Sequence, residues 1–216
     1  MIVTELHQGT KLYLLVGGRG TRLASITKGK PKPLVDVHHR SFLDYVLENL
    51  SGFSITLVCS DLNYDEFVQY EKHGIEVFNE GSPSGSAGFL SKIDLPESFY
   101  VMNGDTFFTG ELSLDVDEST IFVAEEDVTH DVGYIRGKNG KVVSFVEKNP
   151  DASGKELVSL GIYKLFKKDL DIPKKLPISM EYDILPEIDV SYKILKTRRF
   201  DIGTPDRLKT FQDYIC

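Results

Sequence analysis

Short apolar runs alternate with stretches of helical spacing along the first half of the chain. The runs that predict buried strands are residues 12–16, 55–59, 75–78 and 99–102. Between these runs, residues 41–50 and 64–73 have the spacing of amphipathic helices. Ser41 is in position to cap the first helix, since its hydroxyl can accept a backbone N–H of the first turn. Strands that alternate with helices indicate an α/β fold with helices on the faces of a sheet.

The second half of the chain has a different pattern, in which strands follow one another through short turns. The apolar runs that predict these strands are residues 121–124, 133–135, 142–146 and 157–163. Asn139-Gly140 is a strong hairpin signal, because both residues tolerate the positive φ of a two-residue turn. We therefore predict an α/β protein, with a Rossmann-like three-layer α/β/α fold, a mostly parallel central sheet and an additional small β region in the second half.

The composition is that of a globular protein in a reducing compartment. A chain of 216 residues is long enough for one domain with a substantial core. No window reaches the ~18 apolar residues that span a membrane, and the N-terminus lacks the basic and apolar regions of a signal peptide. The two cysteines, Cys59 and Cys216, make neither a disulfide framework nor a metal cluster. We expect a cytoplasmic protein with no membrane association.

A glycine-rich stretch follows the first apolar run directly. Gly17, Gly18 and Gly20 occupy three of four positions, which lets the backbone turn sharply and approach a ligand closely. The backbone N–H groups of such a loop can hold phosphate oxygens. Arg19 and Arg22 lie in the same loop, and arginine matches phosphate geometry with paired donors. The alternative interpretation is a glycine-rich hairpin, which leaves the arginines unexplained.

The charge distribution favours a small anionic ligand. No Asp or Glu occurs from Leu6 to Val35. The basic residues of that span are Lys11, Arg19, Arg22, Lys28, Lys30 and Lys32. The whole chain has a net charge of −8, so an isolated basic segment points to a polyanionic small molecule and not to nucleic acid. The loop also lacks the third glycine of a dinucleotide fingerprint and the Gly-Lys-Ser/Thr of a P-loop.

Two aspartates follow apolar runs that predict strands. Asp105 comes after residues 99–102, and Asp201 after the last apolar run. Ligands collect at the carboxyl ends of strands in open α/β sheets. Two carboxylates that meet there, as at the ends of parallel neighbouring strands, predict a magnesium site. The alternative is structural, with Asp105 closing a turn and Asp201 capping a last helix whose start Thr204-Pro205 already explains.

Two further segments combine capping chemistry with candidate ligand contacts. The run from Glu80 to Gly88 is rich in small residues that permit close backbone approach, and Ser84 or Ser86 is in position to cap a following helix. Ser179 is in position to cap a helix that carries Glu181 in its first turn. An ordinary loop before a helix is the alternative for the first segment, and first-turn capping chemistry alone is the alternative for Glu181.

The stretch from Gly17 to Leu23, followed by Pro31-Lys32-Pro33-Leu34, resembles the signature of the sugar-nucleotide pyrophosphorylases. These nucleotidyltransferases join a sugar 1-phosphate to a nucleoside triphosphate. Gly104-Asp105 and Asp201-Ile202-Gly203-Thr204-Pro205 also resemble family segments, so the likeness covers nearly the whole chain. The resemblance implies one nucleotidyltransferase domain over residues 1–216, with a nucleotide-binding half at 1–110 and a sugar-phosphate-binding half at 111–216.

The resemblance also implies roles for individual residues. Arg22 would stabilise the leaving pyrophosphate, Lys32 would neutralise the α-phosphate region, and Asp105 would complete the catalytic set. Asp105 and Asp201 would be the ligands of Mg2+. The nucleotide-binding residues implied in this way are Gly17, Gly18, Gly20, Thr21, Glu80, Gly85 and Ser86. The implied sugar-phosphate-binding residues are Gly133, Glu147, Lys148, Ser159 and Glu181.

The reaction implied by the resemblance joins a nucleoside triphosphate and a sugar 1-phosphate into a nucleotide sugar and releases pyrophosphate. The chain length and residues 103–108 resemble the heptose 1-phosphate guanylyltransferase branch, which implies GTP with a heptose- or mannose-type 1-phosphate. The alternative activities are those of uridylyl-, thymidylyl- and cytidylyltransferases of the same fold. A homo-oligomer is also compatible with the sequence. A nucleotide-sugar-dependent glycosyltransferase usually carries Asp-x-Asp, which Asp105-Thr106-Phe107 breaks. A non-catalytic nucleotide-sugar-binding subunit would be expected to lose the arginine, the lysine or an aspartate.

Overall fold

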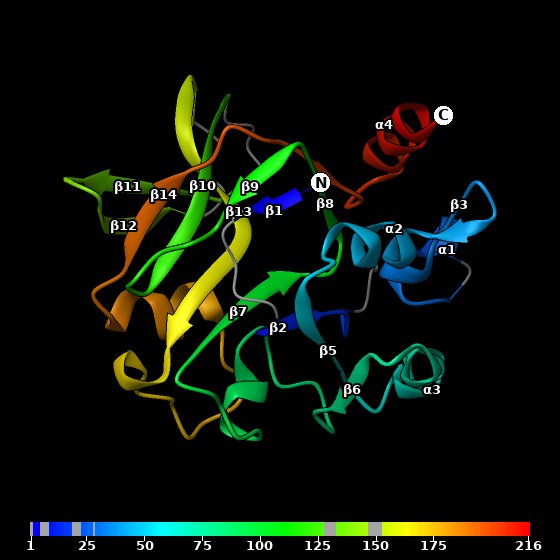
Figure 1. Cartoon of the computed structure of the whole chain (residues 1–216), viewed down its shortest axis with the longest axis horizontal. Coiled ribbons are helices and arrows are strands. Elements are labelled where there is room, and N and C mark those ends of the chain that lie inside the picture. The colour runs from blue at the N-terminus through cyan, green and yellow to red at the C-terminus, as the bar shows by residue number, and fades with distance from the viewer. Residues whose placement is uncertain (1, 5–8, 19–22, 28, 128–132, 147–152) are drawn as a thin grey trace.

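Nine strands form one sheet within the part of the chain that the computed structural model describes, which is residues 2–4, 9–18, 23–27, 29–127, 133–146 and 153–216. In spatial order they are β10 (Thr120–Asp127), β14 (Ser191–Ile194), β12 (Lys141–Val146), β11 (Tyr134–Lys138), β13 (Lys155–Phe166), β7 (Ser98–Asn103), β2 (Thr10–Leu15), β5 (Phe53–Cys59) and β6 (Glu76–Asn79). Figure 1 shows β2, β5 and β7 at the centre of the molecule, with β10, β11, β12 and β14 to their left.

The sheet is mixed. β7, β2, β5 and β6 are parallel to one another, and β13 is antiparallel to β7. β10 pairs with β13 as well as with β14, so five strands of the second half form a closed ring of pairings. The predicted α/β class is confirmed. The prediction of a mostly parallel sheet is wrong, because β13 and its neighbours pair antiparallel, and in the second half β10 and β14 alone form a parallel pair among the described residues.

The remaining strands make short pairs beside the sheet, and helices complete the fold. The strand pairs are β1 (Ile2–Thr4) with β9 (Glu111–Ser113), β8 (Thr106–Thr109) with β15 (Arg198–Asp201), and β3 (Asp36–Val37) with β4 (Arg40–Ser41). The helices are α1 (Ala24–Thr27), η2 (Lys32–Leu34), α2 (Phe42–Asn49), α3 (Tyr64–Phe67), η3 (Val68–His73), η4 (Gly88–Ser91), η5 (Lys167–Asp169), η6 (Met180–Ile184), η7 (Leu185–Glu187) and α4 (Pro205–Ile215). None of these helices is long and apolar enough to cross a membrane.

Both faces of the sheet are covered, because side chains alternate between them along each strand. Leu12 and Leu14 of β2 belong to a core that includes α2, α3 and α4, whereas Tyr13 belongs to a second core with η4, η6 and η7. Figure 1 shows α2 and α4 on the right of the molecule, with α4 next to the C-terminus. Helices therefore lie on both sides of the strands that end at the candidate site.

Two local predictions are confirmed. The Ser41 hydroxyl accepts the Asp44 N–H at 3.1 Å, and the Asp44 carboxylate accepts the Ser41 N–H at 3.0 Å, which makes a capping box at the start of α2. Asn139 and Gly140 have φ of 53° and 79° and join β11 to β12. Lys32–Leu34 forms a helical turn next to Pro31, and Asp36–Val37 follows it as β3.

The carboxyl ends of the parallel strands meet at one edge of the sheet. Val16 after β2 donates to the Val58 carbonyl at 2.9 Å, and Gly104 after β7 donates to the Leu15 carbonyl at 2.9 Å. Glu80 after β6 donates to the Cys59 carbonyl at 2.8 Å. The glycine stretch, the small-residue segment and the Asp105 segment therefore start side by side.

Candidate active site

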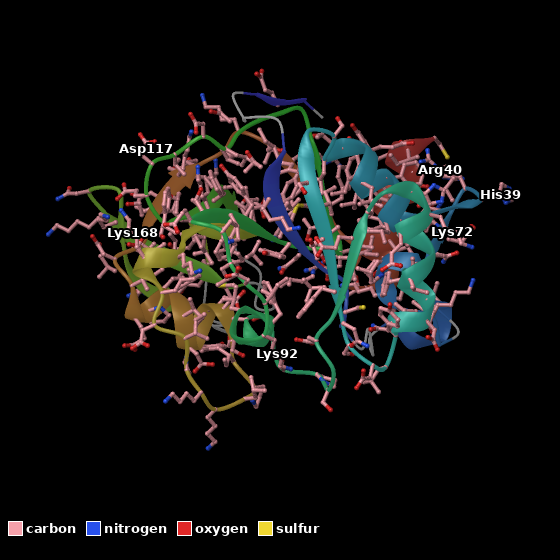
Figure 2. All side chains as sticks on the ribbon, turned by 60° about the horizontal axis from the view of Figure 1, so that its bottom comes forward. His39, Arg40, Lys72, Lys92, Asp117 and Lys168 are labelled. Atoms are coloured by element: carbon pink, nitrogen blue, oxygen red, sulfur yellow. The ribbon has the colours of Figure 1, made fainter. Side chains whose placement is uncertain are left out.

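Two charged side chains at the strand ends are largely buried, in contrast to charged side chains on the rest of the surface. Lys72, Lys92 and Lys168 project into solvent (Figure 2). Lys32 and Asp201 instead have only 12% and 23% of their side chains exposed. Burying a charge costs free energy unless the charged group has a partner. Charged side chains at the strand ends therefore need either a bound ligand or neighbouring side chains of opposite charge.

The first cavity, of about 420 Å³, lies where β2, β5, β6 and β7 end. Its lining includes Gly17 and Gly18 together with Glu80, Gly85 and Ser86. A Cβ on Gly17 would lie 3.3 Å from the Cys59 Cα, so this glycine packs closely on β5. A Cβ on Gly18 would meet nothing within 4 Å, so its backbone borders open space. These features suit a group that approaches the backbone closely.

The segment from Glu80 to Ser86 is held from both ends. The Glu80 carboxylate accepts the Ser84 hydroxyl and, at 3.4 Å, the Ser84 N–H. Ser86 Oγ accepts the Met180 N–H at 2.8 Å, which ties the first cavity to η6. The prediction that Ser84 or Ser86 caps the next helix is wrong, since η4 starts after Ala87 without a side-chain cap. The Ser84 hydroxyl instead makes a local hydrogen bond to Glu80, and the Ser86 hydroxyl makes a tertiary one with Met180.

We expect Gly85→Ala to destabilise the fold more than Gly81→Ala. Both glycines have positive φ, +90° and +77°, which costs alanine ~1–2 kcal/mol in free energy of unfolding. A Cβ at Gly85 would also overlap the Ile178 carbonyl, whereas one at Gly81 meets nothing within 4 Å. Overpacking should add a further ~1–3 kcal/mol for Gly85→Ala alone. Denaturant unfolding of both variants measures the difference, and equal losses would contradict the observed packing.

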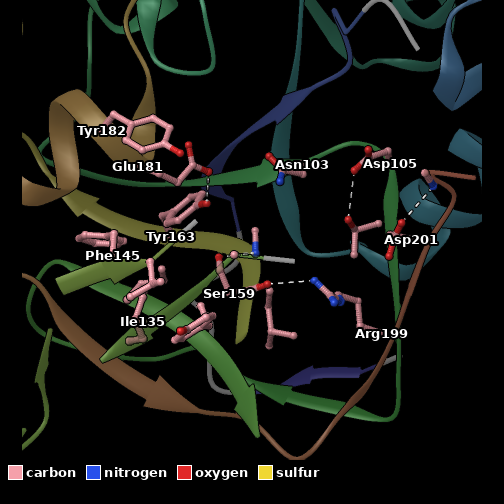
Figure 3. Close-up of a pocket in the computed structure, with 18 of the residues that line it drawn as sticks. Asn103, Asp105, Ile135, Phe145, Ser159, Tyr163, Glu181, Tyr182, Arg199 and Asp201 are labelled. Atoms are coloured by element: carbon pink, nitrogen blue, oxygen red, sulfur yellow. Dashed lines mark hydrogen bonds between the residues drawn. The ribbon is translucent and has the colours of Figure 1, made fainter. Parts of the chain in front are cut away.

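The second cavity, of about 320 Å³ (Figure 3), shares lining residues with the first. Gly133, Ser159 and Glu181, three of the residues implied for the sugar phosphate, line its wall together with Ile135 and Phe145. Lys32, Asn103 and Asp105 line both cavities. The two cavities thus share a short wall that carries one cation and one carboxylate.

Glu181 reaches the second cavity from η6, which starts with Ser179 as its cap, as predicted. The Tyr163 hydroxyl donates to Glu181 Oε1 at 2.8 Å, and the Ser179 hydroxyl donates to Oε2 at 3.3 Å. Burial and then the negative charge of Glu181 raise the pKa of Tyr163 well above its ordinary value. Tyr163 therefore stays a neutral donor that fixes the orientation of Glu181.

The structure brings Asp105 and Asp201 together, by a route that differs from the predicted one. β8 and β15 pair antiparallel with Asp201 opposite Thr106, and Ile202 N–H donates to the Asp105 carbonyl at 3.1 Å. The sequence predicted that the two aspartates end parallel neighbouring strands, and this prediction is wrong. Both line the second cavity. The juxtaposition is a consequence of strand pairing between distant segments.

Each aspartate already has cationic and neutral donors. Asp105 accepts a hydrogen bond from Lys32 Nζ, and Asp201 Oδ1 accepts Arg207 Nη1 and the Gly203 N–H, both at 3.0 Å. Among the residues that the structure describes, no three His, Cys, Asp or Glu side chains form a metal-binding group. Two carboxylates are a suitable protein share for Mg2+, which commonly completes its shell with waters and substrate phosphates. The donor set therefore fits such an ion.

Some residues implied by the sequence lie outside the described part of the chain, and others were missed. The residues outside the described part are Gly20, Thr21, Arg22, Glu147 and Lys148. Asn103, Tyr163, Arg199 and Arg207 line the second cavity without having been identified from the sequence. Asn103 has a signal that could have found it, since it ends a strand two residues before Asp105. Tyr163 ends the predicted strand at residues 157–163, whereas Arg199 and Arg207 carry no motif.

The chain is similar to several known proteins. A family model described as nucleotidyl transferase matches residues 11–213. The chain is 31% identical over 213 residues to D-glycero-alpha-D-manno-heptose 1-phosphate guanylyltransferase of Campylobacter jejuni, covering 89% of this chain and 94% of that one. It is 29% identical over 221 residues to the mannose-1-phosphate guanylyltransferase catalytic subunit beta of Dictyostelium discoideum, covering 90% of this chain but 61% of that longer one. The crystal structure of HddC from Yersinia pseudotuberculosis complexed with GMP-PN superimposes with a TM-score of 0.80 at 27% identity, covering 96% of this chain and 100% of that chain.

Proposed function

Since the chain belongs to the nucleotidyl transferase family, we propose that it transfers a guanylyl group from GTP to a heptose- or mannose-type sugar 1-phosphate. A phosphate oxygen of the sugar 1-phosphate attacks the α-phosphorus of the nucleotide. The bond between the α-phosphorus and the bridging oxygen to the β-phosphorus breaks, and pyrophosphate leaves. The products are a GDP-sugar and pyrophosphate, and no covalent enzyme intermediate is needed.

One observation carries the proposal: two adjoining cavities share Lys32, Asn103 and Asp105. A transfer between two bound molecules requires that their reacting ends meet at one place, where a cation can neutralise the charge that develops. We assign the first cavity to the nucleotide, with Gly17, Gly18, Glu80, Gly85 and Ser86 as its contacts. Gly20, Thr21 and Arg22 complete this part of the assignment, with Arg22 on the leaving pyrophosphate.

The second cavity is assigned to the sugar phosphate. The Glu181 carboxylate is in position to accept hydrogen bonds from sugar hydroxyls. Ser159 and Gly133 line the same cavity. Glu147 and Lys148 belong to this set by the family pattern. In this assignment the chain is one domain, with residues 1–110 supplying most nucleotide contacts and residues 111–216 most sugar-phosphate contacts.

Asp105 and Asp201 would hold a divalent cation, and we propose Mg2+ for it. Bound there, the ion would supply charge neutralisation to the phosphates of both substrates. The protein's own part is to keep the two carboxylates in one place through the β8–β15 pairing and the Gly203 N–H. Lys32, which contacts Asp105, offers its ammonium to the phosphate at the shared wall.

We expect GTP to be preferred over ATP, CTP, UTP and dTTP by at least ~10-fold in kcat/KM, because a base-reading group left without its hydrogen bond costs ~1–3 kcal/mol. We choose guanine because the chain is similar to guanylyltransferases, one of which is matched over 94% of its length. Pyrophosphate release with the five nucleotides and with mannose, glucose and heptose 1-phosphates measures the preference. A clear preference for UTP, dTTP or CTP would contradict the guanine assignment and leave the transfer reaction standing.

A further inference from the structure

The wall of the second cavity contains an irregularity in β13. Phe122 of β10 pairs with Ile162, but the next residue, Val123, pairs with Ser159, so Leu160 and Gly161 have no partner in β10. Such a bulge bends the strand and re-aims its side chains. Gly161 has φ of +67°, and a Cβ there would overlap the Asn103 side-chain amide. The bulge, residues 159–161, lines the second cavity together with Asp105 and Asp201.

Arg199 of β15 spans the distance to this bulge (Figure 3). Its Nη1 donates to the Ser159 carbonyl at 3.0 Å, and its Nη2 donates to Glu126 Oε2 at 3.0 Å. The side chain is 16% exposed. Because side chains alternate along a strand, Arg199 and Asp201 lie on one side of β15, while Phe200 between them is buried in the core.

The chemistry of these contacts makes the link stiff. A guanidinium is planar and donates in fixed directions, so two acceptors on it are held in one geometry. Charge-assisted hydrogen bonds are stronger than neutral ones. The partner of Nη1 is a backbone carbonyl, so the contact fixes the main chain of the bulge and not a rotatable side chain. Asp201 is two residues away on the same strand, so the bulge and this carboxylate are held in register.

We propose that Arg199 is a positioning residue that sets the affinity for the sugar 1-phosphate by holding the bulge of β13 against the strand of Asp201. The inference rests on the proposed function. Arg199 acts through the Ser159 backbone, which places the sugar-facing wall relative to the phosphate end of the cavity. Arg199 lines the second cavity but not the nucleotide cavity, and neither of its two hydrogen-bond partners, Ser159 and Glu126, lines the nucleotide cavity.

Arg199→Gln and Arg199→Lys test this inference, with Lys193→Gln as the matched control. Lys193 also links segments through a cation, donating to Ser113 Oγ at 3.2 Å and the Asp115 carbonyl at 3.1 Å, but it lines neither cavity. Steady-state kinetics use GTP with mannose or heptose 1-phosphate, whichever the parent turns over faster. Calorimetric binding of the same sugar 1-phosphate and thermal unfolding are measured on each variant.

We expect Arg199→Gln to raise KM and Kd for the sugar 1-phosphate by roughly 10- to 100-fold, as for a lost hydrogen bond to a charged group. The KM for GTP should change less than threefold. Arg199→Lys should recover part of the loss, because an ammonium can still donate one bond to the Ser159 carbonyl. Lys193→Gln should change neither KM. Glu126→Gln should resemble the parent more than Arg199→Gln does, since the Ser159 contact remains.

Two results would overturn the inference while the transfer reaction stands. One is an Arg199→Gln variant whose KM and Kd for the sugar 1-phosphate equal those of Lys193→Gln. The other is a loss that affects both substrates equally and follows the unfolding temperature, which a merely structural arginine would produce. A parent that neither transfers to nor binds any sugar 1-phosphate would instead overturn the proposed function, and with it the premise of this inference.

Discussion

Asp201→Asn and Asp105→Asn should each lower turnover by at least ~10²–10³-fold while the protein stays folded, the size expected for loss of one preorganised electrostatic group at the reacting phosphates. Asparagine keeps an oxygen in place of Asp201 Oδ1, so the Gly203 N–H retains its acceptor. What asparagine loses is the negative charge that a divalent cation requires. The purely structural interpretation, in which Asp201 only starts the loop before α4, predicts little change for the same substitution.

Asp206→Asn is the control for this substitution. Asp206 lies in the first turn of α4, five residues beyond Asp201, is exposed and lines neither cavity. Asp206→Asn should lower the free energy of unfolding by ~0.3–1 kcal/mol, because a charge near the start of the helix is lost, and should leave turnover unchanged. Turnover at saturating substrates, with thermal unfolding and a magnesium titration, separates the two effects. A chelator should abolish parent activity and added Mg2+ should restore it. Full turnover of either active-site variant at ordinary magnesium would show that its carboxylate does not serve a shared metal site.

Lys32→Gln should lower kcat by ~10²–10³-fold, because an ammonium at the shared wall neutralises charge only when the phosphates meet there. Lys32 is the cation that lines both cavities among the residues described, and it contacts Asp105. Because the Lys32 side chain is only 12% exposed and contacts a carboxylate, its loss should also lower the free energy of unfolding, by roughly 1–3 kcal/mol. Lys32→Arg should retain part of the rate, since it keeps the charge but changes the donor geometry.

Lys30→Gln is the matched control for Lys32→Gln. It removes the same charge two residues earlier, from an exposed side chain that lines neither cavity. Single-turnover and steady-state rates for both variants, at saturating GTP and sugar 1-phosphate, measure the difference. If Lys32→Gln and Lys30→Gln lose rate equally, the shared wall has no catalytic role for its ammonium.

Features that depend on neighbouring residues were accessible from the sequence. The capping box at Ser41, the Asn139-Gly140 turn and the caps at Ser179 and Thr204 all follow from short-range chemistry. The position of Asp105 after a buried strand placed it correctly at the carboxyl edge of the sheet. Local signals of this kind are reliable because the groups that satisfy them are a few residues apart.

Features that depend on distant segments were not accessible. The β8–β15 pairing brings Asp201 opposite Thr106, and no local pattern specifies that partner. Ser86 was expected to cap a helix, but its hydroxyl accepts a hydrogen bond from Met180, 94 positions away. Arg199 and Arg207 read as ordinary surface charges until the fold places them beside the bulge and Asp201. Tertiary packing decides these contacts, and one sequence contains no record of it.

The central claim is that the two cavities bind the two substrates of one transfer reaction. Phosphorus-31 NMR of the protein with GTP, mannose or heptose 1-phosphate and Mg2+ tests it most directly, because it follows each phosphorus atom. We predict that the α-phosphorus of GTP and the phosphorus of the sugar 1-phosphate become the two coupled atoms of one diphosphate, with an equal amount of inorganic pyrophosphate. Release of inorganic phosphate or GMP without a sugar diphosphate, or no reaction with any nucleotide and sugar 1-phosphate of the panel, would contradict the account.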